Sequence, residues 1–444
     1  VRRGGDPLHR SRVLWRAFVT TSAGPQAPPL ENTANNLSAD DRRRLRWDRR
    51  SLLWKASSLQ RVRHCGLVPT SNAGSVTMRC RDSLAGFAGL QHCGSVWSCP
   101  VCSSRILVHR ALEIGSVLGE AIRQGHPLGF VTLTMHHRKG HALDLLWAAG
   151  QKGWQRAISG RGWVAVEELV EGWVRVWEVT EGRNGWHVHV HLVVVLAKGS
   201  DAQALELVAG GMFDRWSRGL VAAGLDAPRR VGQDWHLAEG AQAAEQLAEY
   251  LAKSVQVGRA GANAEAIANA ARVNLADGLG LELTHGMSGR AREGLATRPV
   301  WSLLDDLAET GEASALRRWH EWERGSKGKQ QVGWSNGLRD RFASTLDEVT
   351  DQQIVDQAVG DEHDDVAAWT ADEWREFVAR PERVAELLEV GERGGRESVH
   401  ALLIEWGTVC TLIGPKAGGV GGAGASAAGG PAGVHGIGSM RDGP

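Results

Sequence analysis

An alternating run of histidines constrains the fold of this chain more than any other feature of its sequence. In GWHVHVHLVVVL, residues 185–196, His187, His189 and His191 occupy every second position before an aliphatic run. This alternation predicts a β-strand, because side chains two residues apart on a strand point to the same face. The preceding stretch alternates too, so residues 172–196 predict a hairpin with EGRNG as its turn. The three imidazoles therefore form one row on a rigid element.

The segments around the hairpin carry strand and helix patterns in turn. Short alternating runs at 128–137 and 234–239 predict two further strands. Apolar residues at helical spacing predict helices at 110–125, 141–158, 201–224 and 241–257. Strands interleaved with covering helices predict an α+β fold, with one antiparallel sheet and helices packed on it.

Composition divides the chain into five predicted segments. Clustered Arg among Pro, Ser and Asn predicts a basic, largely flexible arm with one helix near its end. Five of the six cysteines follow this arm. The Gly/Ala-rich composition of the last residues predicts a disordered tail. The segments are the arm at 1–58, a cysteine-rich zinc-binding segment at 59–108, the sheet domain at 109–300, a mainly helical, acidic region at 301–413 and the tail at 414–444.

The formal net charge is zero, but the charge is unevenly distributed. Residues 1–63 carry 14 Arg or Lys against 5 Asp or Glu, whereas residues 346–400 carry 5 against 16. The basic front could bind phosphate, and the acidic region could repel it or contact a partner. We find no apolar run long enough for a membrane span and no apolar signal core, so we expect a cytoplasmic protein.

The histidine row predicts a metal site. Neutral imidazoles that converge from one strand face suit a divalent first-row metal, although a single strand histidine is more often a packed side chain. Glu178 lies on the preceding strand of the hairpin and could add a carboxylate or simply face solvent. His137, at the end of the first predicted strand with His136, is a further candidate.

The cysteines predict a second metal site. Cys99 and Cys102 form a CPVC knuckle that can present two thiolates to one ion, and Cys93 lies six residues upstream. In a reducing cytoplasm this spacing favours structural Zn²⁺ over a disulfide. Candidates for the fourth ligand are Cys65, Cys80 and His92, of which Cys65 is favoured because a glycine follows it. Cys410 stands alone.

The chain has 19 Trp but a single Tyr, Tyr250, within AEYLAKSV. The segment predicts a helix, which places Lys253 on the same side as Tyr250. A phenol is a poor nucleophile at neutral pH, and a neighbouring ammonium would favour the phenolate. Taken alone, Tyr250 is better explained as a core or helix-surface aromatic than as a nucleophile.

These features occur in a recognisable order. CGSVWSCPVC, FVTLT, WEVTEGRNGWHVHVH, EYLAK and GWSNGLRDRF follow one another between Cys65 and Phe342. The arrangement resembles the HUH endonucleases, named for histidine–hydrophobic–histidine, and more narrowly the rolling-circle plasmid replication initiators of high-GC Gram-positive bacteria.

The resemblance implies a central antiparallel sheet of about five strands and a DNA-nicking reaction. His189 and His191 would hold Mg²⁺ or Mn²⁺, with His187 or Glu178 as a third ligand. Tyr250 would attack a phosphodiester of single-stranded or cruciform plasmid origin DNA. The products would be a 5′-phosphotyrosine and a free 3′-OH, which primes host DNA polymerase behind a host helicase. The strand is later rejoined.

One position departs from the pattern that the resemblance implies. Related single-tyrosine initiators can carry a glutamate one helical turn before the tyrosine, thought to activate water at termination. Here that position is Gln246, with Glu245 and Glu249 beside it. Either glutamate is therefore a candidate for this step.

Other functions remain open on the sequence. The same chemistry serves HUH transposases and relaxases, although no GxxxxGK phosphate-binding loop of a large relaxase helicase is visible. A zinc-containing DNA-binding regulator without catalysis would use the histidines as a second structural site. A hydrolase with zinc at the histidines would not need Tyr250. Metal-dependent formation of a covalent DNA adduct, lost in Tyr250→Phe, separates these alternatives.

Overall fold

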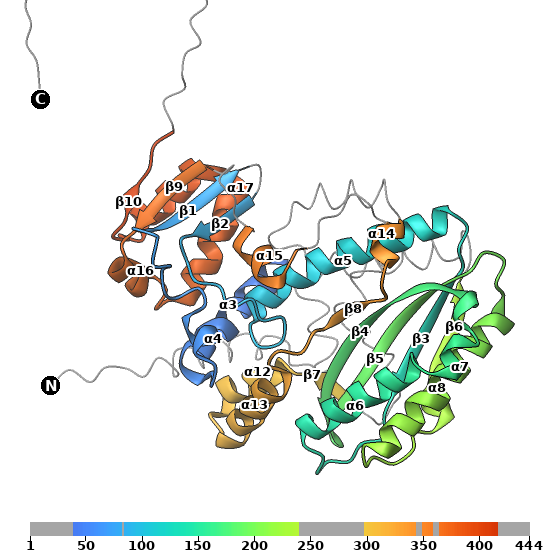
Figure 1. The fold of residues 1–444 in the computed structure, drawn as a ribbon. Coiled ribbons are helices and arrows are strands. Elements are labelled where there is room, and N and C mark those ends of the chain that lie inside the picture. The colour runs from blue at the N-terminus through green and yellow to red at the C-terminus, as the bar shows by residue number, and fades with distance from the viewer. Residues whose placement is uncertain (1–38, 82–83, 239–296, 343–348, 358–363, 416–444) are drawn as a thin grey trace, which may run out of the picture. The chain divides into compact units, whose positions relative to one another are not determined.

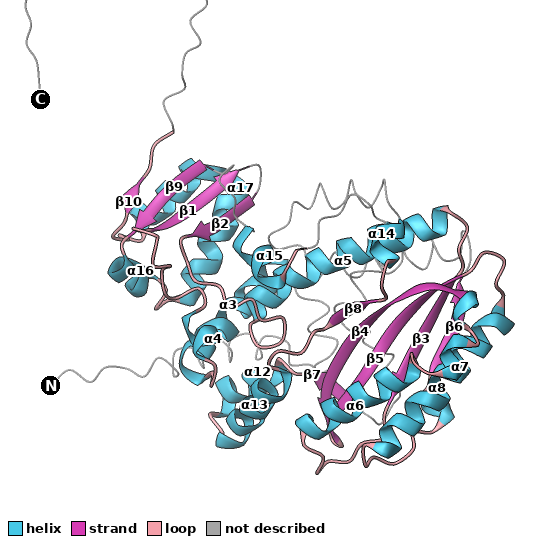
Figure 2. Cartoon of the chain, viewed as in Figure 1, coloured by secondary structure: helices cyan, strands magenta, loops and turns pink. Residues whose placement is uncertain are grey.

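The computed structural model contains two antiparallel sheets with helices packed on them (Figure 1, Figure 2). The described residues are 39–81, 84–238, 297–342, 349–357 and 364–415. The α+β class and the antiparallel sheet are confirmed, although we predicted one sheet rather than two. The predicted helix at 241–257 lies outside the described residues, as do the first 38 residues of the predicted arm.

The larger sheet has the strand order β6-β3-β5-β4-β7, with β8 also paired to β4, and all pairs are antiparallel. Its strands are β3 (Leu128–Thr134), β4 (Val170–Gly182), β5 (Gly185–Leu196), β6 (Asp234–Ala238), β7 (Thr297–Pro299) and β8 (Val332–Trp334). The first four strands coincide with the predicted strands and hairpin. The short β8 comes from the segment that was predicted to be mainly helical.

The β4–β5 hairpin is closed by a tight turn at Arg183 and Asn184. Gly185 follows the turn at a φ of +83°, and a Cβ built there would lie 3.1 Å from the Cα of Lys139. Only glycine satisfies both demands at low cost. The turn thereby fixes the register of the hairpin, which decides which side chains of β4 face the histidine row.

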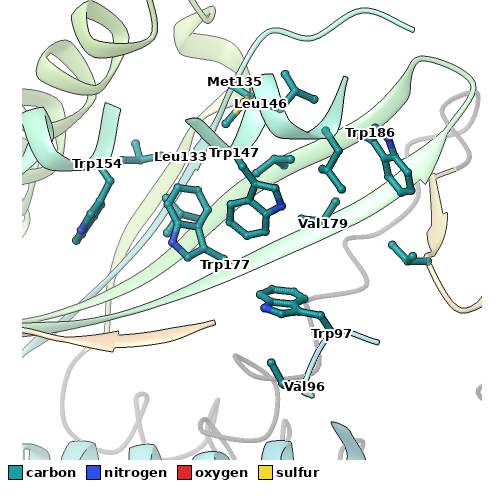
Figure 3. Close-up of a cluster of buried hydrophobic side chains, with 14 of the residues drawn as sticks. Val96, Trp97, Leu133, Met135, Leu146, Trp147, Trp154, Trp177, Val179 and Trp186 are labelled. Atoms are coloured by element: carbon teal, nitrogen blue, oxygen red, sulfur yellow. The ribbon is translucent and has the colours of Figure 1, made fainter. Parts of the chain in front are cut away.

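One face of this sheet packs against α6 (Leu143–Ala157) and α8 (Ala202–Ala222) (Figure 1). Val188 and Val190, which alternate with the histidines, lie in this core. Tryptophans fill much of it, and Figure 3 shows Trp147 and Trp177 side by side, with ring centroids 5.4 Å apart. The histidine row therefore belongs to the opposite face.

The opposite face is covered at one end by α5 (Pro100–Arg123) and α14 (Leu338–Phe342). Val193 and Val195, which continue the histidine row along β5, are fully buried in this second core. The aliphatic end of β5 is thus enclosed on both faces, which explains its unbroken apolar run. The histidines occupy the other end of the same strand.

The smaller sheet has the order β10-β9-β1-β2 and was not predicted. Its strands are β1 (Val76–Arg81), β2 (Leu84–Ala88), β9 (Asp364–Trp369) and β10 (Thr411–Leu412), packed with α16 (Ala371–Phe377) and α17 (Pro381–Glu405). Strands of the cysteine-rich segment therefore pair with a strand of the acidic segment.

The remaining elements connect these parts of the chain. They are α3 (Ala39–Ala56), α4 (Gln60–His64), α7 (Arg161–Val164), η1 (Glu167–Leu169), η2 (Arg230–Gly232), α12 (Ser302–Thr310), α13 (Ala313–Ser326) and α15 (Asp351–Gln357). The helix predicted near 40–58 corresponds to α3. Within the described ranges, no helix combines the length and apolar character needed to cross a bilayer.

Candidate metal centres

The hairpin register brings two of the predicted histidines onto one carboxylate. Glu178 on β4 lies opposite His189 on β5, and His191 is two residues further along the same strand face. The Nε2 atoms of His189 and His191 each lie 2.8 Å from Oε2 of Glu178. One ligand atom from each residue lies within 4.8 Å of the others, which is the spacing of groups around a single ion. We call Glu178, His189 and His191 the histidine centre.

Electrostatics keep this centre ready to accept a cation. Burial alone would raise the pKa of Glu178, but the charge and hydrogen bonds of the two histidines lower it well below its usual value. Burial lowers the pKa of His191, which favours neutral imidazole. One carboxylate and two imidazoles form a donor set that fits a divalent first-row cation.

A hydroxyl outside the centre orients one of its imidazoles. Oγ1 of Thr132 on β3 lies 3.2 Å from Nδ1 of His191, so the Nε2 atom faces Glu178. Such outer partners fix the orientation of a metal-binding histidine. The buried Nδ1 of His189 has no hydrogen-bond partner among the described residues. The sequence analysis did not find Thr132, although its alternation with Phe130 and Thr134 places it on the histidine face.

His187 is not part of this group; it pairs with His137. Nδ1 of His187 lies 2.9 Å from Nε2 of His137, and Nδ1 of His137 lies 3.1 Å from the carbonyl oxygen of Asn184. A carbonyl only accepts, so Nδ1 of His137 donates and its Nε2 accepts from His187. Burial, then the charges of His189 and His137, lower the pKa of His187 to about 3. His187 is therefore neutral, with its Nε2 unprotonated.

Four cysteines form a second, separate group. The Sγ atom of Cys65 lies 3.7 Å from that of Cys99 and 3.5 Å from that of Cys102, and Cys93 lies 3.7 Å from Cys102. All four are buried, and their sulfur atoms lie within 4.8 Å of one another. We call this group the cysteine centre. Four converging thiols fit a tetrahedral Zn²⁺ site, and their donor chemistry selects for this metal.

The local backbone explains how these thiols converge. Cys65 and Cys93 each lie within the sequence His-Cys-Gly, and the following glycines, Gly66 and Gly94, have φ values of +67° and +60°. These left-handed residues turn the chain immediately after each sulfur. Cys99 is the N-cap residue of α5, so its sulfur also lies at a helix N-terminus, where negative charge is favoured.

The thiols of the cysteine centre share protons unequally. Burial would raise the pKa of Cys99, but hydrogen bonds from Cys102, Cys65 and Cys93 and the charge of Arg50 lower it well below its usual value. The hydrogen bond to Cys102 lowers the pKa of Cys93, but those to Cys65 and Cys99, together with burial, raise it overall. Hydrogen bonds to the other three thiols, and burial, raise the pKa of Cys102. The centre therefore readily holds negative charge, which a cation would extend to all four sulfurs.

The remaining metal candidates lie elsewhere. Cys80 is on β1 within the core of the smaller sheet, and burial raises its pKa to about 12. His92 lies against Asp356 and Arg105, with Nδ1 3.4 Å from Oδ1 of Asp356. Cys410 packs beside the smaller core. The predicted catalytic residues Tyr250, Lys253, Glu249 and Glu245 lie outside the described residues.

Comparisons with known proteins identify the segment that carries the histidine centre. Residues 88–207 match the family model described as "Replication protein". This segment is therefore similar to replication proteins of that family. The predicted relationship to replication proteins is thereby confirmed. The segment contains the whole histidine centre and three of the four cysteines of the cysteine centre.

Two curated Streptomyces proteins resemble this chain. "Protein rep" of Streptomyces lividans is 28% identical over 350 residues, which cover 66% of this chain and 73% of the relative. "Neomycin resistance protein" of Streptomyces cyanogenus is 28% identical over 185 residues, covering 33% of this chain and 42% of the relative. No solved structure matches the chain.

Sequence reasoning missed one residue that adjoins the cysteine centre. Arg50 lies in the run DDRRRLRWDRR, where it looks like one more member of a solvated basic cluster. In the structure it is fully buried. The available signal was its helical spacing, because Trp47, Leu53 and Trp54 lie three or four residues away on the same face of α3.

Proposed function

We propose that this chain is a plasmid rolling-circle replication initiator that nicks one strand of origin DNA through a tyrosine nucleophile. One observation carries the proposal: the replication-protein segment holds an anionic carboxylate and two imidazoles on a rigid hairpin, with their ligand atoms within 4.8 Å. A site of this kind has few uses in a replication protein other than handling a phosphodiester. The proposal also takes Tyr250 from the sequence.

The histidine centre would hold Mg²⁺ or Mn²⁺ through Glu178, His189 and His191. When bound, the cation would polarise the scissile phosphate and offset its developing charge. The residues themselves provide rigidity, because both strands of the hairpin are paired on each side. Thr132 keeps the imidazole of His191 turned toward the site. Three protein ligands leave coordination positions open to a phosphate oxygen, as catalytic sites require.

The chemical step would be a transesterification. The phenolic oxygen of Tyr250 forms a bond to phosphorus, the bond from phosphorus to the 3′ oxygen breaks, and that oxygen takes up a proton. The products are a 5′-phosphotyrosine and a free 3′-OH that can prime a host polymerase, with host helicase opening the duplex. The reverse reaction rejoins the strand. Lys253 would favour the phenolate, and Glu249 or Glu245 would serve at termination.

The cysteine centre would hold structural Zn²⁺. Its sulfurs are closed off from solvent, which leaves no open coordination position. Its ligands join α4, the loop before α5 and the first turn of α5. Because α5 also packs on the strand that carries the histidines, zinc would fix one wall of the nickase domain.

A library of single-stranded oligonucleotides with a 3′ fluorophore tests this function. Incubation with Mg²⁺ or Mn²⁺ should transfer label to the protein, and the adduct should survive denaturation. Sequencing of the captured DNA gives the sequence on the 3′ side of the nick, and peptide mapping should find the label on Tyr250. Tyr250→Phe should abolish the adduct, whereas Trp163→Phe, an aromatic exchange on α7, should leave it unchanged.

The other outcomes identify other functions. Metal-dependent cleavage that persists in Tyr250→Phe would indicate a hydrolase and overturn the tyrosine mechanism. Sequence-specific binding without cleavage in any metal would indicate a zinc-containing DNA-binding regulator.

A further inference from the structure

Arg50 is a fully buried cation whose surroundings are dominated by sulfur. It lies on α3 with no exposed surface. A buried charge is costly unless it is paired and hydrogen-bonded. Among the described residues, no carboxylate forms an ion pair with Arg50. Burial disfavours its charge, and the neighbouring thiols of the cysteine centre, Cys99 foremost, favour it.

The guanidinium makes three directional contacts. Nε donates to the carbonyl oxygen of Cys65 at 3.0 Å, and Nη2 donates to the carbonyl oxygen of Val62. Nη1 lies 3.9 Å from Sγ of Cys99. One side chain therefore contacts both the backbone of one cysteine and the sulfur of another.

The carbonyl contacts lie at the end of α4. The last carbonyls of a helix have no partner within the helix and need donors from elsewhere. Arg50 donates to the carbonyl of Cys65 and adds a second donor to that of Val62, which also accepts from the Cys65 amide. Nε1 of Trp54, one turn further along α3, also donates to the Cys65 carbonyl at 2.9 Å. These bonds fix the turn at Cys65 and Gly66 that aims the sulfur at its three partners.

The charge contact matters once a metal is bound. Four thiolates around one Zn²⁺ leave a net charge of about −2 in a buried site. A guanidinium at this distance offsets part of that charge, and hydrogen bonds from an outer residue normally stabilise metal-bound ligands. Without the thiolates, Arg50 would be a buried cation with no counter-charge. The thiolates therefore explain why an arginine can be buried here, and the arginine explains how their negative charge is offset.

We propose that Arg50 is the positioning and charge-compensating residue of the cysteine centre, and that it retains the metal by clamping Cys65 and neutralising the thiolates. The proposal rests on the zinc assignment made above. It makes α3 a component of the site, although α3 supplies no ligand. Metal retention would then depend on a residue outside the segment that matches the family model.

Zinc loss from the full-length chain tests this role. Wild type, Arg50→Met, Arg50→Lys and a control, Arg215→Met, would be compared for bound zinc per chain and for its rate of transfer to a chromogenic chelator. Arg215 is also a buried arginine, but its guanidinium donates to the carbonyls of Ala157 and Gly162, away from the cysteines. Far-ultraviolet circular dichroism would compare the folding of all four proteins.

Arg50→Met should lose zinc about 10- to 100-fold faster than wild type, which is the usual effect of removing an outer-shell partner. Arg50→Lys keeps the charge but cannot reach both carbonyls and the sulfur. Its rate of zinc loss should therefore lie between those of wild type and Arg50→Met. Arg215→Met should keep its zinc at the wild-type rate, even if it is less stable.

The failures are distinguishable. Zinc-loaded wild type with unchanged loss from both Arg50 variants would overturn the role of Arg50 and leave the zinc assignment intact. Wild type without zinc would overturn the zinc assignment, and this proposal with it. If Arg50→Met does not fold, the Arg50→Lys rate decides: faster loss than wild type supports the proposal, and an equal rate refutes it.

Discussion

The two candidate centres of this chain differ in how they are enclosed. Cys99 and Cys102 have no exposed surface, and their neighbours come from a turn, a loop and a helix start. In the histidine centre, the Glu178 side chain keeps 15% of its surface exposed, and all three ligand residues lie on one hairpin. A closed site with four protein ligands stabilises a fold, whereas an open site with three can admit a substrate.

Removing a ligand of the closed centre should have the largest effect on folding. Cys99→Ser should lose zinc and lower the free energy of unfolding by on the order of 5 kcal/mol, because binding a structural metal contributes directly to folding. Thermal unfolding with and without a chelator measures this. Cys80→Ala is the matched control: it also removes a buried thiol, but its cost should be small and independent of the chelator. Equal, chelator-independent losses would refute a structural zinc.

The open centre should show the opposite balance between stability and activity. His189→Ala or Glu178→Gln should lower the rate of adduct formation on the order of 1,000-fold, since the metal stabilises transition-state charge by several kcal/mol. The melting temperature and the affinity for uncleaved DNA should change little. Glu171→Gln, on the same strand but paired with Arg341, is the control. Retained cleavage in His189→Ala would remove the metal assignment.

The comparison also explains what could be predicted from sequence. The histidine centre is local: alternation put His189 and His191 on one face, and the short turn put Glu178 opposite them. Cys65 could be chosen as a candidate because Gly66 permits the required turn, and the structure brings it to the other three thiols. These inferences needed only short-range geometry.

Long-range pairing could not be predicted in the same way. Val76 on β1 pairs with Trp369 on β9 in the smaller sheet, but the sequence of neither strand indicates which distant strand it pairs with. The region after residue 300 therefore looked helical, and a second sheet was missed. Arg50 was hidden for a related reason, because its charge could be interpreted only once the thiols beside it were known.

Breaking the pair between His187 and His137 tests whether His187 is a metal ligand or a neighbour of the histidine centre. His137→Phe removes the acceptor for Nδ1 of His187, so the proton can move to Nε2 and the ring loses its orientation. We expect adduct formation to slow by about 10-fold, at the lower end of effects from outer-shell partners. Metal affinity, measured by Mn²⁺ titration, should remain near that of wild type. Loss of Mn²⁺ binding would instead indicate that His187 is a ligand.

The smallest expected effect concerns Cys80, the buried thiol outside both centres. Burial raises the pKa of Cys80 from 9.0 to about 12, so the folded chain keeps a proton that the unfolded chain loses as the pH rises above 9. Its contribution to stability is therefore complete below pH 9 and declines as the pH rises toward 12. The urea midpoint of wild type should fall slightly more between pH 8.5 and about 10 than that of Cys80→Ala. Parallel pH dependences would show that this thiol is not held protonated by the fold.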